Sequence, residues 1–257
     1  MKKICLITGA SRGIGFATAL ALAEEGFDIA AVALPDPERM DELRQKVREL
    51  GRQFSSYELD LGKIEAHAEV IDGVIADFGA VDCLVNNAGV SVLSRGDLLD
   101  MSVESYDRCF NINTRGTFFF TQAVARHMAS TQTAAGNYRS IVFISSSNAV
   151  AVSVERGEYC MSKTALSMAC KLFSLRLAQH GIAVFEVQPG VIMTEMTAPV
   201  KAKYDTLIAQ GLTVEPRWGY PEDVARVVRT MAAGLLPYTV AQEVRVDGGL
   251  MIKRVGA

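Results

Sequence analysis

Short apolar runs alternate along the chain with longer stretches in which apolar residues recur at helical spacing. The apolar runs occupy residues 3–8, 27–33, 54–59, 81–85, 141–144, 182–187 and 243–246. The helical stretches include residues 16–25, 38–50, 102–130 and 157–180, a segment that ends near Phe78, and another that begins at Pro221. A short apolar run between turn signals is typical of a buried strand. The alternation predicts an α/β fold with a single doubly wound parallel sheet of about seven strands and helices on both faces.

No linker, repeat or low-complexity segment interrupts this alternation, so residues 1–257 are expected to form a single domain. One stretch breaks the pattern. Residues 193–218 mix helix-forming and polar residues and end at Trp218, the only tryptophan. We expect this stretch to form a lid over the substrate.

Composition narrows the class of protein. The chain is 49% hydrophobic and 21% charged with a net charge of −3, and it carries no basic run, which argues against nucleic acid as a partner. No apolar run reaches the roughly 20 residues of a membrane span, and the apolar start is too short for a signal peptide. The five cysteines are scattered and never form a CxxC pair, which favours reduced thiols in the cytoplasm and no metal site.

A glycine-rich turn follows the first predicted strand. Thr8-Gly9-Ala10-Ser11-Arg12-Gly13-Ile14-Gly15 leads directly into a helix. Strand, glycine-rich turn and helix is the context of a dinucleotide-binding loop, because glycines let the backbone approach a pyrophosphate and the helix N-terminus offers N–H groups. The spacing is GxxxGxG rather than the standard GxGxxG, and such a turn can also be a simple connection.

The end of the second strand normally separates NAD from NADP, because an acidic residue there holds the ribose 2′-hydroxyl and basic residues hold a 2′-phosphate. Here the strand ends in Ala33-Leu34-Pro35, and an acid arrives late, at Asp36. Arg12 in the glycine loop could meet a phosphate. These features conflict. We predict a slight preference for NADP and leave NAD open.

Polar residues follow two further strands. Asp60-Leu61 is suitably placed for an adenine edge, although Asp60 could equally cap the next helix. Asn86-Asn87-Ala88-Gly89 is a turn that would face the ligand crevice of a parallel sheet. Within the stretch 102–130, Asn113 and Gly116 are unfavourable in a helix. Two broken local rules so close together indicate a functional position.

Tyr159 and Lys163 stand four residues apart in a stretch with helical spacing. They would lie on one face, one turn apart. A free tyrosine loses its proton near pH ~10, and a neighbouring ammonium favours the phenolate. Ser146, after the run 141–144, could donate a hydrogen bond to a substrate oxygen. Alone, such a pair is usually a half-buried ring beside a solvated charge.

Taken together, these motifs resemble the short-chain dehydrogenase/reductase family over nearly the whole chain, from Thr8 to Gly249. The resemblance implies a Rossmann-type fold, an NAD(P)-dependent oxidoreductase that interconverts a secondary alcohol and a ketone, and a homotetramer. It rests on the TGxxxGxG loop, Asp60, NNAG at 86–89, Asn113, Ser146, YxxxK at 159–163, and Pro189-Gly190 with Thr194.

The resemblance also implies a role for each motif. Tyr159 would be the general acid or base, Lys163 would lower its pKa and hold the nicotinamide ribose, and Ser146 would polarise the carbonyl. Ser146 is chosen over Ser145 and Ser147 because it lies twelve residues before the tyrosine. Asn113 would hold a water that joins Lys163 to a proton relay. The remaining cofactor contacts would be Gly9, Ser11, Arg12, Gly13, Ile14, Gly15, Leu34, Asp60, Leu61, Asn87, Ala88, Gly89, Pro189, Gly190, Ile192 and Thr194.

The substrate is less clear from the sequence. The segments Arg217–Ala225 and Val246–Gly249 resemble those of 3-oxoacyl-[acyl-carrier-protein] reductases. The basic residues expected in a carrier-protein docking patch are missing at His180-Gly181 and at Asn137-Tyr138, which favours the alternative of a sugar, polyol or hydroxy-acid dehydrogenase. Arg95 and Arg156 would suit an anionic substrate if they point inward, and otherwise are surface charges. A non-catalytic nucleotide-binding regulator is a distant alternative, because all four catalytic positions are filled.

Overall fold

A computed structural model describes residues 2–131 and 138–252 and shows a seven-stranded sheet. The strand order is β3-β2-β1-β4-β5-β6-β7, and every neighbouring pair is parallel. The strands are β1 (Lys3–Thr8), β2 (Phe27–Ala33), β3 (Phe54–Glu58), β4 (Cys83–Asn86), β5 (Arg139–Ile144), β6 (Ile182–Pro189) and β7 (Glu243–Val246). The predicted doubly wound, Rossmann-type sheet is confirmed.

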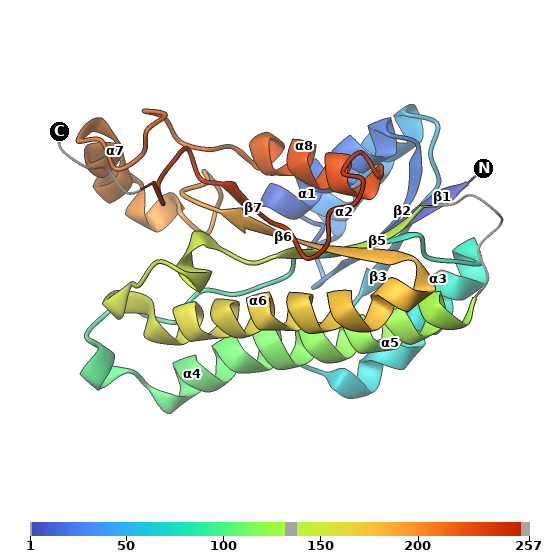
Figure 1. Ribbon diagram of the computed structural model, residues 1–257, viewed down its shortest axis with the longest axis horizontal. Helices are drawn as coiled ribbons and strands as arrows, with labels where there is room; N and C mark the ends of the chain where they lie inside the picture. Colours follow the sequence, from blue (N-terminus) through green and yellow to red (C-terminus); the bar gives the residue numbers. More distant parts are fainter. Residues whose placement is uncertain (1, 132–137, 253–257) are drawn as a thin grey trace.

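Helices cover both faces of this sheet (Figure 1). One layer holds α1 (Gly13–Glu24), α2 (Pro37–Glu49) and α8 (Pro221–Ala232); the other holds α3 (His67–Phe78), α4 (Val103–Cys109), α5 (Thr117–Ser130) and α6 (Gly157–Leu177). Successive strand residues point to opposite faces, so Leu6 packs into one apolar cluster and Ile7 into the other. The short α7 (Lys201–Ala209) stands apart from both layers.

The strand order reverses beside β1. The chain runs outward through β2 and β3, then returns to place β4 on the other side of β1. In such sheets the ligand crevice lies outside the carboxyl ends of the strands at this switch point. Most of the polar motifs found in the sequence follow the ends of strands, so the fold directs them to the same edge.

The stretch expected to be one helix over 102–130 is interrupted. Ser102 caps α4, a π-helix occupies Phe110–Gly116, and α5 follows. The two residues that broke helix rules, Asn113 and Gly116, both lie in the π-helix, a conformation that occurs frequently at functional sites. The cause at Gly116 is steric, because a Cβ there would lie 2.3 Å from the carbonyl oxygen of Leu61.

The capping role considered for Asp60 is wrong. α3 begins only at His67, after a 3₁₀ turn at Ile64–Ala66. The Asp60 carboxylate instead accepts a hydrogen bond from the Gly62 N–H at 2.9 Å. Its side chain therefore shapes the turn after β3, close to the crevice.

Other boundaries shift only slightly. α1 begins at Gly13, three residues before the expected start, and β5 begins at Arg139. Asn137, named above for carrier-protein docking, lies outside the described residues. Within the described chain, no helix combines the length and apolar character needed to cross a bilayer.

Candidate active site

Four buried polar side chains meet at the carboxyl edge of the sheet. Tyr159 and Lys163 lie one turn apart on α6, Ser146 follows β5, and Asn113 comes from the π-helix. Gly89, in the turn after β4, fits between two of them: a Cβ there would lie 3.2 Å from Asn113 Oδ1 and 3.3 Å from Lys163 Nζ. The sequence therefore places these residues correctly as one cluster.

The Asn113 side chain is held by several hydrogen bonds. Its Oδ1 accepts from the Val90 N–H at 2.8 Å, and its Nδ2 donates to the Val90 carbonyl at 2.9 Å and to Ser162 Oγ at 3.0 Å. Both amide hydrogens are thereby used. A water bound at Asn113 would therefore have to donate a hydrogen bond to a carbonyl oxygen.

Two consecutive serines after β5, Ser145 and Ser146, have different hydrogen-bond partners. Ser145 Oγ donates to the buried carboxylate of Glu186 and so points into the protein. Ser146 Oγ accepts from the Asn148 N–H at 3.1 Å, and its hydroxyl lies within hydrogen-bonding reach of Tyr159. This arrangement supports Ser146 over Ser145 as the catalytic serine.

Glu186 also connects α6 to the sheet through hydrogen bonds. Its Oε2 accepts from Ser167 Oγ at 2.7 Å, one turn beyond Lys163, and its Oε1 accepts from Gln188 at 3.0 Å. The carboxylate thus links α6, β5 and β6 directly behind the site. The sequence does not reveal the role of Glu186, because an acidic residue inside an apolar strand gives no indication of its partners.

Burial dominates the ionisation of the pair on α6. Burial raises the pKa of Tyr159, and the neighbouring Ser146 hydroxyl and Arg156 guanidinium oppose that rise. Burial also lowers the pKa of Lys163 to about 8, so the ammonium still predominates at neutral pH. The fall in the Tyr159 pKa expected from Lys163 is absent from this structure, and the Lys163 ammonium instead donates to the Ile144 carbonyl at 3.0 Å.

The glycine loop is built for close approach. Gly9 and Gly13 have positive φ angles of 67° and 54°, and a Cβ on Gly15 would lie 2.0 Å from the Gly9 carbonyl oxygen. Arg12, the N-cap of α1, makes no side-chain cap hydrogen bond, so the first-turn N–H groups remain for a ligand. Backbone donors at a helix N-terminus suit a pyrophosphate.

The turn after β4 holds this loop in place. Asn87 Nδ2 donates to the carbonyls of Thr8 and Gly9, each at 3.0 Å, and the Asn87 and Ala88 N–H groups donate to Thr8 Oγ1, each at 3.1 Å. The Asn87 side chain is therefore a support of the loop. By contrast, the buried Asn86 amide has no protein partner among the described residues.

The other predicted cofactor residues line the same edge. Thr194 packs on Gly13, since a Cβ there would lie 3.4 Å from Thr194 Cγ2. Gly190, after Pro189, packs tightly on Asp247, and Ile192 forms an isolated bridge with Gly219. Leu34 is exposed and Leu61 is buried at the ends of β2 and β3, and Ser11 and Ile14 lie half-buried in the loop.

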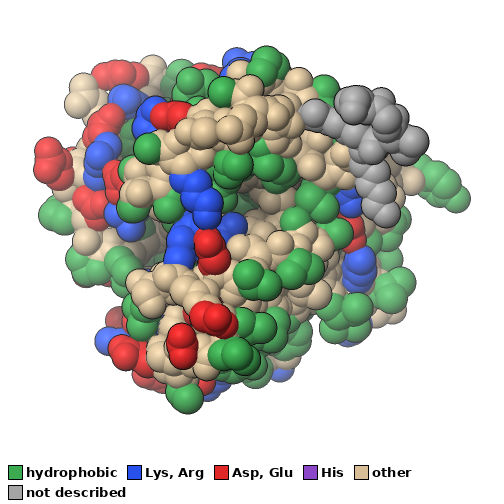
Figure 2. All heavy atoms as spheres, turned by 90° about the vertical axis from the view of Figure 1, so that its left-hand side faces the viewer, with side chains coloured by type: hydrophobic (Ala, Val, Ile, Leu, Met, Phe, Trp, Pro, Cys, Tyr) green, Lys and Arg blue, Asp and Glu red, His purple; other side chains and the backbone are tan. Residues whose placement is uncertain are grey.

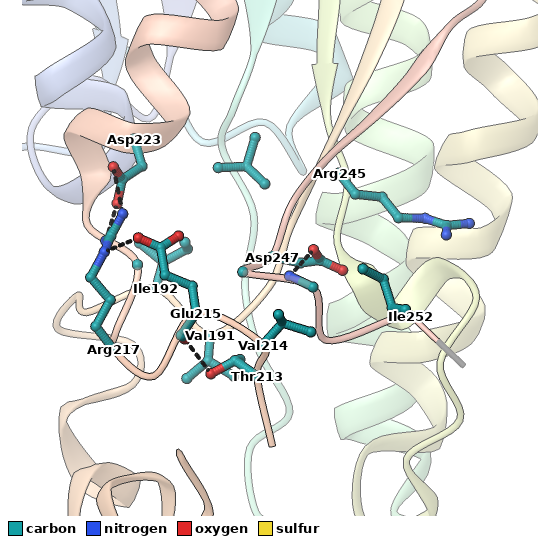
Figure 3. A pocket seen from close by; sticks show the side chains of 14 residues that line it. Val191, Ile192, Thr213, Val214, Glu215, Arg217, Asp223, Arg245, Asp247 and Ile252 are labelled. Atoms are coloured by element: carbon teal, nitrogen blue, oxygen red, sulfur yellow. Dashed lines mark hydrogen bonds and ion pairs between the residues drawn. The ribbon is translucent and has the colours of Figure 1, made fainter. Parts of the chain in front are cut away.

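The stretch expected to form a lid, residues 193–218, contributes to a small apolar cluster separate from the two main ones. Trp218 packs with Val191 and Ile208, and its Nε1 donates to Asp205 on α7 at 2.7 Å. Figure 3 shows Arg217 reaching from this segment to Asp223 at the start of α8, with N–O distances of 2.7 and 3.3 Å. A cavity of about 510 Å³ lies between residues 213–219 and the end of β7, and its lining does not include Asn113, Ser146, Tyr159 or Lys163.

Several charged side chains lie near Tyr159. The Arg156 guanidinium lies 5.3 Å from the Tyr159 ring centre, and its Nη2 donates to Asn148 Oδ1 at 2.5 Å. The Lys203 ammonium of α7, 3.0 Å away, lowers the pKa of Glu155, and Arg95 and Arg156 add smaller effects in the same direction. Figure 2 shows Lys and Arg side chains gathered beside a hollow on the side of the molecule that lies at the left of Figure 1. Arg156 therefore points inward, as an anion-binding role requires.

No group of three or more His, Cys, Asp or Glu side chains in the described part of the chain could hold a metal ion. The four clustered side chains are of types that can take part in proton transfer and hydrogen bonding, and the glycine loop suits a phosphate.

Comparisons with known proteins agree with this geometry. The short chain dehydrogenase family profile matches residues 3–205. The chain is 32% identical over 253 residues to 2-dehydro-3-deoxy-D-gluconate 5-dehydrogenase from Dickeya dadantii, covering 98% of this chain and 96% of that protein. It is 34% identical over 252 residues to 3-oxoacyl-[acyl-carrier-protein] reductase from Thermotoga maritima, covering 97% and 98%.

A similar crystal structure is that of a 3-oxoacyl-[acyl-carrier protein] reductase from Brucella melitensis in complex with NAD. It is 41% identical with a TM-score of 0.95, and the match covers 99% of each chain. The family expected from the motifs is thereby confirmed. The chain belongs to the short-chain dehydrogenase/reductase family and is an NAD(P)-dependent oxidoreductase acting on CH–OH groups or the corresponding carbonyls.

Proposed function

We propose that Asn113, Ser146, Tyr159 and Lys163 are the catalytic residues of this oxidoreductase. The observation that carries the proposal is their convergence, buried, at the carboxyl edge of the sheet beside the glycine loop. In the direction of reduction, the Tyr159 hydroxyl would donate a proton to the carbonyl oxygen of the substrate, and Ser146 Oγ would donate a hydrogen bond to the same oxygen. In oxidation, Tyr159 would accept the proton.

Lys163 would position the nucleotide in this proposal. Its ammonium would hold the ribose hydroxyls next to the nicotinamide, while Ser146 and Arg156 are the groups that oppose the effect of burial on the pKa of Tyr159. Asn113 would support a water through a carbonyl oxygen and so connect Lys163 to solvent. The nicotinamide nucleotide supplies the hydride when bound.

The loop residues fit a dinucleotide. Gly9, Gly13 and Gly15 let the loop fold tightly against itself and its neighbours, and the uncapped N-terminus of α1 offers N–H donors to phosphates. Asp60 and Leu61 would contact the adenine, Ala88 and Gly89 the ribose, and Ile192 and Thr194 the carboxamide. We assign Asn87 the support of the loop in addition to its ribose-side position.

The first candidate substrate is a 3-oxoacyl thioester. Relatives from Thermotoga maritima and Brucella melitensis carry that activity in their names. The segment Arg217–Ala225, which resembles that of these reductases, also supports this candidate. Within it, Arg217 forms an ion pair with Asp223 that connects the proposed lid to α8.

The second candidate is a sugar acid, which the position of Arg156 favours. Arg156 Nε is buried without a protein partner among the described residues, and the guanidinium lies over the Tyr159 ring. A substrate carboxylate could take that donor. A relative that this chain matches over nearly its whole length is named a 2-dehydro-3-deoxy-D-gluconate 5-dehydrogenase.

One assay tests the function and separates the candidates. Nicotinamide absorbance is followed with NADH and NADPH, offering a short 3-oxoacyl thioester and, in both directions, a panel of sugar acids and polyols. Tyr159→Phe is expected to remove turnover while nucleotide binding persists. Retained turnover in that variant would refute the acid–base role.

Arg156 distinguishes the two substrate classes in the same assay. For a sugar acid, Arg156→Gln should raise KM by about tenfold or more, because a charge-assisted hydrogen bond is lost, whereas a neutral polyol should be unaffected. An unchanged KM for every acidic substrate would exclude the carboxylate role.

We further propose that residues 193–218 form a lid, that the protein is a cytoplasmic homotetramer, and that the whole chain is a single domain. The separate packing of Trp218 with α7 supports the lid.

A further inference from the structure

Three charged side chains from distant segments meet beside the glycine loop. Arg12 comes from the glycine loop, Arg39 from the first turn of α2, and Glu195 directly follows Thr194 at the start of the lid. Arg12 Nη1 lies 2.8 Å from Glu195 Oε2, and Arg39 Nη2 lies 3.4 Å from Glu195 Oε1. One carboxylate therefore bridges two guanidinium groups. Arg39 also lies 3.8 Å from Glu42 Oε2.

The position of this bridge matters for the choice of nucleotide. α2 follows the end of β2, where dinucleotide-binding folds place the group that meets the ribose 2′ position. Here that strand end carries the exposed Leu34. The late acid, Asp36, caps α2 by accepting from the Arg39 N–H at 3.4 Å. Glu195 is thus a carboxylate that contacts a side chain from the first turn of α2 but comes from outside the β2–α2 connection.

We propose that Glu195 selects against the 2′-phosphate and makes this enzyme prefer NAD to NADP. Without Glu195, Arg12 and Arg39 would present two positive charges to a phosphate. With Glu195 between them, their side-chain donors are partly occupied and an incoming phosphate meets a carboxylate of like charge. A ribose 2′-hydroxyl carries no charge and can donate to the same carboxylate.

The ion pairs need not be strong for this selection to work. All three side chains are about half exposed or more, so the bridge itself contributes little to stability. The discrimination arises from repulsion between two anions at close range, which is screened by salt. The inference rests on the proposed nucleotide site, and it adds a residue of the lid to the determinants of cofactor choice.

Direct binding tests the inference without a known substrate. NADH and NADPH are titrated by nucleotide fluorescence into the wild type and Glu195→Gln. A second, matched pair of ligands is titrated by calorimetry: 5′-AMP and adenosine 2′,5′-bisphosphate, which differ only in the 2′-phosphate. The wild type should bind NADH more tightly than NADPH. Glu195→Gln should lower the Kd of NADPH and of the bisphosphate by about tenfold at low salt, and leave those of NADH and 5′-AMP within about twofold.

Two control variants make the result specific. Glu24→Gln changes the net charge equally, but Glu24 lies at the far end of α1, where it pairs with Arg229 at 3.7 Å. It should leave all four affinities unchanged. Adding Arg12→Gln to Glu195→Gln should reverse the gain for the 2′-phosphate, because one of the two cations is then missing.

The outcomes separate the inference from the proposed function. If Glu195→Gln leaves the NADPH affinity unchanged, or shifts NADH and NADPH equally, the selection by Glu195 is refuted while the nucleotide site stands. Tighter binding of NADPH than NADH by the wild type would also refute it. If neither nucleotide binds to either protein, the proposed site itself fails and the inference falls with it.

Discussion

Lys163 carries its ammonium into a site from which water is almost entirely excluded. Its side chain is buried, and burial lowers the pKa to about 8 from the ordinary value of 10.5. Between these two pH values the unfolded chain binds more protons than the folded one at this position. The free energy of unfolding should therefore rise with pH across that window, and the full penalty should be present below pH 8.

Lys163→Met removes this penalty while it keeps an unbranched apolar stem. From pH 8 to pH 10, the stability of the wild type should rise relative to Lys163→Met by on the order of 2 kcal/mol. Urea unfolding of both proteins at intervals of pH measures the difference, in which contributions from all other groups cancel. Parallel curves would show that Lys163 titrates normally.

At the residue scale, the sequence predicted what is local. Tyr159 and Lys163 could be paired because four residues along a helix bring side chains to the same face. Glu195 could not be found in this way, because its partner Arg12 lies 183 positions away. The same holds for Glu186, because its partner Ser145 lies 41 positions earlier, directly after another strand. Only the folded sheet brings such groups together.

The π-helix is the element that places Asn113, and a single close approach accounts for its last residue. A Cβ on Gly116 would lie 2.3 Å from the Leu61 carbonyl oxygen and 3.0 Å from that of Asn111. Both are backbone atoms that cannot rotate away. Gly116→Ala should therefore lower the free energy of unfolding by about 3 kcal/mol, at the upper end for overpacking, and reduce kcat because Asn113 shifts.

Gly73→Ala provides a matched control inside α3. The nearest atom to a Cβ there is Cε1 of the Tyr57 ring at 3.2 Å, the edge of a side chain that can move. The higher helix propensity of alanine offsets this contact, so stability should stay within about 1 kcal/mol of the wild type. Comparable stability of the two alanine variants in urea would contradict the steric explanation.

At the element scale, strands were predicted well because buried parallel strands are continuous apolar runs. The π-helix could not be predicted as such, since its apolar spacing resembles that of an ordinary helix. The need for glycine at its last residue comes from the Leu61 carbonyl of another segment. The two broken helix rules at Asn113 and Gly116 marked the position without revealing its geometry.

At the scale of the whole molecule, α6 has a second apolar face that the sheet does not cover. Its exposed residues are Met161, Met168, Leu172 and Leu175, and the exposed fraction reaches 79% at Leu175. Intervals of seven, four and three residues place them on one side of the helix. α5 lies alongside α6 in the same outer layer and exposes Phe119 (Figure 1). An apolar face of this kind marks an interaction site, which agrees with the proposed homotetramer.

Charges on this face should prevent assembly without unfolding the subunit. Leu172→Glu combined with Leu175→Glu places carboxylates where subunits would meet, and their burial without partners is unfavourable. Light scattering should show a tetramer for the wild type and a smaller species for the double variant. Leu50→Glu, at the end of α2 in the opposite layer, is the control and should keep the wild-type mass.

Tyr159 and Lys163 project from the same helix, towards the sheet. If assembly holds α6 in position, the smaller species should bind nucleotide as the wild type does, because the glycine loop lies on another element, yet turn over more slowly. A wild-type mass for the double variant would remove α6 from the interface. A smaller species with full kcat would show instead that the packing of α6 on its own sheet is enough to position the catalytic pair.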